Sequence, residues 1–177
     1  MRVISIKIVP NYVLKLVVFL LTIYIIDSCS LKHKEEVNSI FDKVNRIEIL
    51  AYVDRNQWNQ EDNPDYLKLN FIQNGKLKIS KKYLKNRISL NKEQIEILKS
   101  KLRKCDRENW AAACYDPRHA ILFYDENDKI FGHIEMCFDC NGSRSSENLK
   151  NFSECALGLE ETFKKFGITY FGEEENN

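Results

Sequence analysis

Two cysteines separated by two residues are the side chains of this sequence with the clearest capacity for chemistry. Cys137 and Cys140 stand in the stretch IEMCFDCNG, at the end of a segment whose pattern predicts a β-strand. A CxxC pair can act as a redox couple, supply half of a metal site or take part in a disulfide. The neighbouring elements decide which other residues reach this pair.

The hairpin that precedes the CxxC pair predicts a wider cysteine cluster. If Tyr124 lies opposite Ile130 across the turn, the antiparallel register places His119 opposite Glu135. Continued outward, the same register brings Cys114 next to the second cysteine of the CxxC pair. Residues more than twenty positions apart along the chain would then form one local cluster.

The favoured interpretation of this cluster is a disulfide. Cys114 would bond Cys137 or Cys140 and close the open end of the hairpin, a cross-link that the chain-entropy account makes stabilising by a few kcal/mol. In an alternative pairing, Cys105 bonds Cys114, and the CxxC pair is left to bond with itself or to bind something else. Cys155 lies on an apolar stripe and is interpreted as a small core residue.

Two chemical alternatives stay open for the same residues. Three thiolates, from Cys114, Cys137 and Cys140, together with His119 would supply the four ligands of a zinc site. Thiol redox exchange is the other alternative, although redox cysteines usually sit at a helix N-terminus, and here the next helix start, near Ser145, follows the pair. A covalent haem is excluded because the CxxC pair lacks the histidine that should follow it.

The stretch CYDPRHA is a second candidate site. Arg118 and His119 beside Tyr115 and Asp116 could bind an anion or perform acid–base chemistry. We favour a structural role, in which Arg118 pairs with Asp139. The sequence contains no GxGxxG, P-loop, GxSxG or HExxH pattern, so it favours a non-catalytic protein over an enzyme.

The start of the chain predicts a secretory signal in residues 1–28. Arg2, Lys7 and Lys15 precede an uninterrupted apolar run over residues 16–26, which is about half of the roughly 20 residues that a membrane-spanning helix needs. The run ends in IIDSC, which resembles the lipobox of bacterial lipoproteins in its aliphatic residue, its small residue and its cysteine, Cys29. Asp27 departs from that pattern, because the residue at its position is usually small and uncharged.

The resemblance implies that Cys29 becomes the lipidated N-terminus after cleavage and carries fatty acids such as palmitate. The protein would then lie in the cell envelope of a bacterium, facing the periplasm or the cell surface and held to a membrane by its lipid. The stretch from Cys114 to Cys140 also resembles small uncharacterised bacterial lipoproteins, to which no activity is attached. The expected partner of the domain is an unidentified protein or small molecule.

The charge balance gives no sign of a nucleic-acid partner. Cleavage before Cys29 removes three basic residues and one acidic residue from the 27 and 26 of the whole chain, which leaves 24 and 25 and a formal net charge of −1. We therefore expect no strong attraction to nucleic acid or to anionic lipid. The predicted organisation is a lipidated tether over residues 29–44, one domain over residues 45–172 and a disordered tail over residues 173–177.

The elements of this domain predict an α+β fold. A strand buried on both faces is expected in RIEILAYVD, a hairpin around Asn74 and Gly75, and a helix with an Asn91–Gln94 capping box over residues 90–104. A second hairpin and a second helix, with an apolar stripe over residues 149–166 and Gly167 as its C-cap, complete the order βββαββα. The expected architecture is an antiparallel sheet of about five strands with two helices packed on one face.

Overall fold

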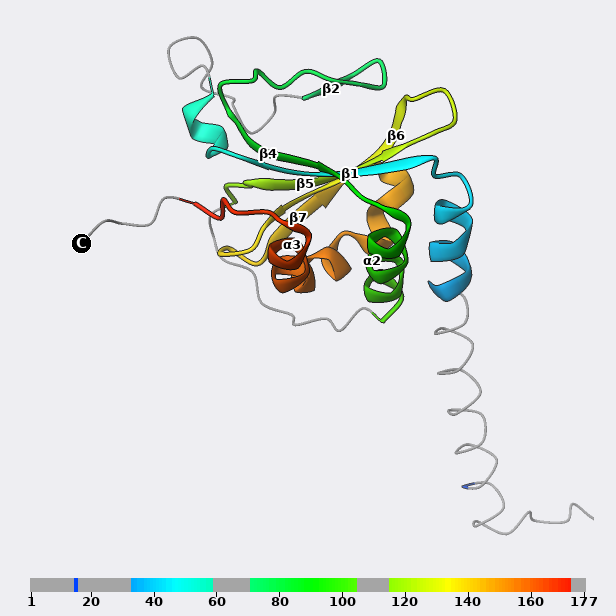
Figure 1. Ribbon diagram of the computed structural model, residues 1–177. Coiled ribbons are helices and arrows are strands. Elements are labelled where there is room, and N and C mark those ends of the chain that lie inside the picture. Colours follow the sequence, from blue (N-terminus) through cyan, green and yellow to red (C-terminus); the bar gives the residue numbers. More distant parts are fainter. Residues whose placement is uncertain (1–14, 16–32, 59–70, 105–114, 173–177) are drawn as a thin grey trace, which may run out of the picture. The chain divides into compact units, whose positions relative to one another are not determined.

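The computed structural model describes residue 15 and residues 33–58, 71–104 and 115–172 (Figure 1). The chain divides into two compact units, residues 1–36 and residues 37–177, and the elements below belong to the second unit. No helix within the described ranges is both long and apolar enough to cross a membrane.

The second unit is built on a five-stranded antiparallel sheet with the strand order β4-β1-β5-β6-β7. Its strands are β1 (Arg46–Tyr52), β4 (Leu84–Ser89), β5 (His119–Tyr124), β6 (Ile130–Cys137) and β7 (Gly142–Ser145). β1 and β5 lie inside the sheet and are buried almost throughout, because both of their faces are covered. The predicted α+β class, with an antiparallel sheet of about five strands, is confirmed.

The identity of the five strands differs from the prediction. The hairpin at Asn74 and Gly75 forms, with both residues at positive φ (53° and 71°), but its strands β2 (Ile72–Gln73) and β3 (Lys76–Leu77) make a separate two-stranded sheet. The places in the main sheet are taken by β4 and β7, which the sequence analysis did not identify. Both are edge strands whose sequences, LKNRIS and GSRS, carry few of the apolar residues that mark a buried strand.

A β-bulge changes the register of the β5–β6 hairpin. Tyr124 does lie opposite Ile130, as predicted, but the next pair is Phe123 with Gly132, so that β6 has one extra residue. His119 therefore lies opposite Met136, and the predicted His119–Glu135 pair is wrong. Because side chains alternate along a strand, the shift of one residue puts His119 and Glu135 on opposite faces of the sheet.

The helix after β4 follows its sequence signals. α2 (Lys92–Lys104) begins with a reciprocal capping box, in which the Asn91 N–H donates to Gln94 Oε1 and the Gln94 N–H donates to Asn91 Oδ1, both at 2.9 Å. Leu98 and Leu102 are buried, and Ile95 on the same face of the helix packs against the same core.

The predicted second helix forms only in part. Residues 147–166 fold as two 3₁₀ segments, η3 (Glu147–Phe152) and η4 (Glu154–Leu159), followed by the short helix α3 (Glu160–Phe166). The side chains of the predicted stripe are nevertheless buried, and Gly167 ends α3 in the left-handed conformation at φ 103°. The apolar spacing thus identified the buried face correctly, whereas several tight turns replace one continuous helix.

Two hydrophobic clusters cover the two faces of the sheet. The larger cluster combines Ile49 of β1 and Ile121 of β5 with buried side chains of α2, η3, η4 and α3. It also includes Val37, within the stretch that the sequence analysis assigned to the tether. The smaller cluster contains Tyr52, Trp58 and Phe71 on the other face, beside the β2–β3 hairpin.

Candidate functional site

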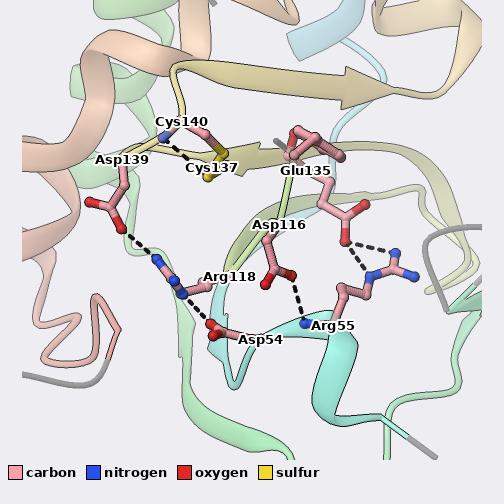
Figure 2. Close-up of a disulfide and its surroundings, with 9 residues drawn as sticks. Asp54, Arg55, Asp116, Arg118, Glu135, Cys137, Asp139 and Cys140 are labelled. Carbon is pink, nitrogen blue, oxygen red and sulfur yellow. Dashed lines mark hydrogen bonds and ion pairs between the residues drawn. A yellow bond between two sulfur atoms is a disulfide. The ribbon is translucent and has the colours of Figure 1, made fainter. Parts of the chain in front are cut away.

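A buried ion pair occupies the face of the sheet that carries the smaller cluster. Arg55 lies in a 3₁₀ turn, η1 (Arg55–Gln57), directly after β1, and Glu135 lies on β6; they are 2% and 6% exposed. Arg55 Nη2 and Nε donate to Glu135 Oε1 at 2.7 and 2.9 Å, and the hydroxyl of Tyr52 donates to the same oxygen at 2.6 Å. Figure 2 shows the guanidinium of Arg55 facing this carboxylate.

Aromatic rings surround the guanidinium of Arg55. The rings of Trp58 and Phe71 both lie 4.9 Å from its central carbon, and Trp58 stacks on Tyr83 with ring centroids 5.5 Å apart. Cation–π contacts of this kind are strongest where water is excluded. The charge of Arg55 thus lies against the Glu135 carboxylate and the faces of these two rings.

The electrostatic environment keeps Tyr52 in its protonated form. Burial, and then the neighbouring Glu135 carboxylate, raise the pKa of Tyr52 well above its ordinary value. Burial also raises the pKa of Glu135, while Arg55 and the Tyr52 hydroxyl act in the opposite direction. The Tyr52 hydroxyl and the Arg55 guanidinium both donate to one oxygen of Glu135. Because the polar atoms of the three side chains are directed at one another, they form a structural network.

The cysteine pair of the CxxC motif forms a disulfide with itself. Cys137, at the end of β6, is bonded to Cys140, with their Cα atoms 5.4 Å apart, and both residues are buried. The favoured prediction, a bond from Cys114 to one of them, is therefore wrong for this structure. The reason is local: residues 138–141 form a turn, with Asn141 at φ 45°, that brings the two cysteines together.

The remaining cysteines are only partly described. Cys155, which the sequence analysis interpreted as a small core residue, is buried and disulfide-bonded. Because Cys137 and Cys140 are bonded to each other, its partner lies outside the described residues. Cys29, Cys105 and Cys114 also lie outside them, so the predicted lipidation site and the pairing of Cys105 with Cys114 remain predictions.

Arg118 connects the CxxC turn to the end of β1. Its guanidinium forms ion pairs with Asp139, as predicted, and with Asp54, which precedes η1 (Figure 2). Asp116 accepts a hydrogen bond from the backbone N–H of Arg55 at 3.1 Å. Through these contacts, Arg118 and Asp116 hold η1 beside the start of β5.

His119 lies apart from both groups, on the helix-covered face of the sheet. Its ring is 2% exposed and contacts Phe138 and Phe171, with centroids 4.9 and 4.8 Å away. Nε2 lies 2.9 Å from the carbonyl oxygen of Tyr170, and burial lowers the pKa of His119 to about 4. At neutral pH the ring is therefore uncharged, with its proton on Nε2.

The predicted zinc ligands are not brought together in the described part of the chain. Strand alternation puts Cys137 on the face of Glu135 and His119 on the other face, and Cys114 is outside the described ranges. Among the residues that are described, no group of three His, Cys, Asp or Glu side chains could hold a metal ion.

The sequence analysis missed Arg55 and Tyr52 and assigned Glu135 to the wrong partner. A carboxylate between Ile134 and Met136, inside a strand, was the available signal, since a buried charge requires an opposite charge. Without knowledge of the bulge in β6, the sequence does not identify Arg55 as the partner of Glu135.

No known protein family, curated protein or solved structure matches the chain.

Proposed function

We propose that this protein is a lipid-anchored envelope protein of a bacterium, whose domain acts as a non-catalytic binding or structural module. The observation that carries the proposal is the state of the cysteines: Cys137–Cys140 is a disulfide, and Cys155 is disulfide-bonded as well. Structural disulfides are typical of proteins exported to an oxidising compartment. The signal-like leader and the lipobox-like IIDSC sequence support the same location.

The non-catalytic part of the proposal is supported by the roles of the polar side chains. Arg55, Glu135 and Tyr52 are directed at one another, and Arg118 is held between two aspartates. These contacts fix the ends of β1, β5 and β6 relative to one another. A module of this kind would present a rigid surface to an unidentified protein or small molecule.

The lipid anchor can be tested in a bacterial host that expresses the full chain. Cells are fed an alkyne-tagged fatty acid, and the N-terminal peptide is then analysed by mass spectrometry. We expect a label on Cys29, no label on a Cys29→Ala variant, and recovery of the wild-type protein with the membranes. An exported chain that is cleaved before Cys29 but carries no fatty acid would refute the anchor.

A second candidate function is thiol–disulfide exchange at the CxxC pair. The specific observation is the backbone N–H of Cys140, which donates to Cys137 Sγ at 3.2 Å and would stabilise a thiolate there after reduction. In exchange, the Cys137 thiolate attacks a partner's disulfide and releases one partner thiolate, and the Cys140 thiolate then displaces the second. The partner becomes a dithiol, and the Cys137–Cys140 disulfide is formed.

Graded redox buffers distinguish this candidate from a structural disulfide. Full-chain samples equilibrated at a series of dithiol-to-disulfide ratios are alkylated without denaturation and analysed by mass spectrometry. Exchange requires that Cys137 and Cys140 reduce in the folded protein at ratios near those of its compartment, and that a Cys140→Ser variant traps a mixed disulfide. A pair that reduces only on unfolding would exclude exchange.

The same samples test the proposed zinc alternative. Zinc would bind Cys137 and Cys140 as thiolates together with Cys114, so it is added to the reduced, folded chain and the native mass is measured. One bound zinc that is lost in a Cys137→Ser variant would support a metal site. Equal zinc content in the two proteins would exclude these ligands.

A further inference from the structure

A segment rich in basic residues extends from the start of β3 to the middle of β4. Residues 76–87, KLKISKKYLKNR, contain five lysines and one arginine and no acidic residue. The lysines are all exposed: Lys76, Lys78, Lys81, Lys82 and Lys85. We call this segment the basic segment. The positive charge of this segment is not apparent from the net charge of the whole chain, +1, because acidic residues elsewhere compensate it.

The apolar residues of the basic segment hold its lysines outward. Leu77, Ile79, Tyr83 and Leu84 are interspersed among the lysines and pack against the smaller hydrophobic cluster. One side of the segment is therefore attached to the core, and the other side carries the ammonium groups. The lysines therefore form one surface whose backbone is held in place by β3 and β4, whereas the lysines of a flexible tail would have no fixed arrangement.

The positive charge of these lysines is not neutralised within the described part of the molecule. Arg87 forms an ion pair with Glu48 at 2.9 Å, but none of the five lysines has a carboxylate within ion-pair distance there. Lys82 lies over the ring of Tyr83, and Lys85 over that of Tyr170, contacts that leave the ammonium charge in place. Five like charges held in one segment attract an extended anionic surface.

We propose that the basic segment binds the anionic headgroups of the membrane to which the protein is anchored. The inference rests on the proposed function, because one acyl-bearing residue brings the domain to a membrane. A lipid anchor can act together with a basic patch on the same protein, which adds electrostatic attraction to anionic lipids. A lysine near an anionic surface strengthens partitioning by about fivefold at moderate salt. The segment would thereby hold the domain close to the bilayer in one orientation.

Lysine footprinting on the full chain tests the orientation. The protein is bound to vesicles of phosphatidylcholine alone or mixed with phosphatidylglycerol, and the rate of acetylation is measured for each lysine. The exposed α2 lysines Lys92, Lys101 and Lys104 serve as the internal control. We expect phosphatidylglycerol to slow acetylation of the basic segment and to leave the α2 lysines unchanged. The protection should disappear in about 1 M salt, where the Debye length is about 3 Å.

Matched variants test the affinity. The readout is the ratio of binding to phosphatidylglycerol vesicles over binding to phosphatidylcholine vesicles, in which any contribution of an apolar N-terminus cancels. The Lys78→Gln, Lys81→Gln, Lys82→Gln variant should lower this ratio by about 100-fold, at about fivefold per lysine. The Lys92→Gln, Lys101→Gln, Lys104→Gln variant removes the same charge from α2 and should leave the ratio unchanged.

Four results would overturn the proposal, and the first three concern the lysines and DNA. These are equal protection of the α2 lysines, an unchanged ratio in the first variant, and stronger protection of the segment by short duplex DNA than by the vesicles at the same salt. Inorganic phosphate that protects the segment as well as the vesicles do would also refute a membrane surface. A chain without fatty acid on Cys29 refutes the anchor alone, because the ratio can still be measured.

Discussion

At the scale of single residues, the carboxylate of Glu135 is a charged group whose burial costs free energy. Its Oε1 accepts three hydrogen bonds in a buried site, one from Tyr52 at the end of β1 and two from Arg55, shortly after β1. Breaking a buried pair by removing one partner destabilises by about 3–5 kcal/mol, whereas a pair on the surface contributes about 0–1 kcal/mol. The chain offers both kinds of pair for comparison.

We predict that Arg55→Met lowers the free energy of unfolding by about 3–5 kcal/mol, because it leaves the Glu135 charge buried without its cation. Glu161→Gln, which removes the exposed pair with Lys164, should leave the free energy of unfolding nearly unchanged. Urea unfolding of the two variants measures both values. Similar losses in the two variants would show that Arg55 and Glu135 are not a buried network in solution.

His119 makes a prediction about pH. Its pKa is about 4 in the folded state and 6.5 ordinarily, because the ring is buried; Tyr170, Arg118, Asp139 and Glu160 make the smaller contributions. Between these two pKa values, His119 of the unfolded chain binds a proton that the folded chain does not bind. The free energy of unfolding therefore has its full value above pH 6.5 and falls as the pH decreases toward 4. The loss due to His119 is about 3 kcal/mol.

The measurement is urea unfolding at several pH values between about 7.5 and 4, a window set by the two pKa values. In a His119→Gln variant the fall over this window should be smaller by about 3 kcal/mol. A smaller pH dependence remains because burial and Arg55 also lower the pKa of His133. Identical pH dependence in the wild type and the variant would contradict a buried, neutral His119.

At the scale of elements, the bulge in β6 decides how η3 packs on the sheet. Gly132 follows the bulge, and a Cβ at this position would lie 2.7 Å from Leu149 Cδ1 and 3.2 Å from Asn148 Nδ2. The absence of a side chain lets η3 approach β6 closely. The same bulge places Glu135 on the face of Arg55, opposite the face on which His119 of β5 contacts α3.

We predict that Gly132→Ala destabilises the domain by about 1–3 kcal/mol, because Leu149 must move out of a packed position. Gly158 in η4 is the matched control, since a Cβ there meets nothing within 4 Å and its substitution with alanine should be neutral or stabilise by up to about 1 kcal/mol. Thermal unfolding of the two variants gives the comparison. A neutral Gly132→Ala would mean that η3 is more loosely packed than described.

At the scale of the whole molecule, both hydrophobic clusters belong to residues 37–177. Among the described residues, the first cluster member along the chain is the buried Val37, and the compact unit begins at the same residue. A domain that contains its own core can fold alone. We therefore expect residues 37–177 to keep their core without the residues that precede them.

We predict that residues 37–177, produced in an oxidising compartment, unfold cooperatively with the same midpoint as residues 30–177. Val37→Ala in the longer protein should cost about 2 kcal/mol, because it removes two methyl groups from the core. Circular dichroism during heating measures the three proteins. A large loss on truncation to residue 37 would show that residues 30–36 contribute to the core.

The sequence alone determined the features that depend on nearby residues. The Asn91–Gln94 capping box, the two positive-φ residues of the Asn74–Gly75 turn and the Gly167 C-cap each involve residues within a few positions, so their types are sufficient to identify them. The burial of β1 and the α+β class follow in the same way from apolar patterns. The sequence also carries the lipobox-like leader, which remains a prediction.

Only the tertiary structure decided which distant residues meet. One extra residue in β6 puts Glu135 on the opposite face of the sheet from His119. Because side chains alternate along a strand, the face of every later side chain of β6 depends on that single bulge. The edge strands β4 and β7 carry few apolar residues, so they are recognised only by their backbone pairing with β1 and β6. The Arg55–Glu135 pair and the outward direction of the five lysines likewise depend on packing between segments far apart in the chain, which local residue types do not specify.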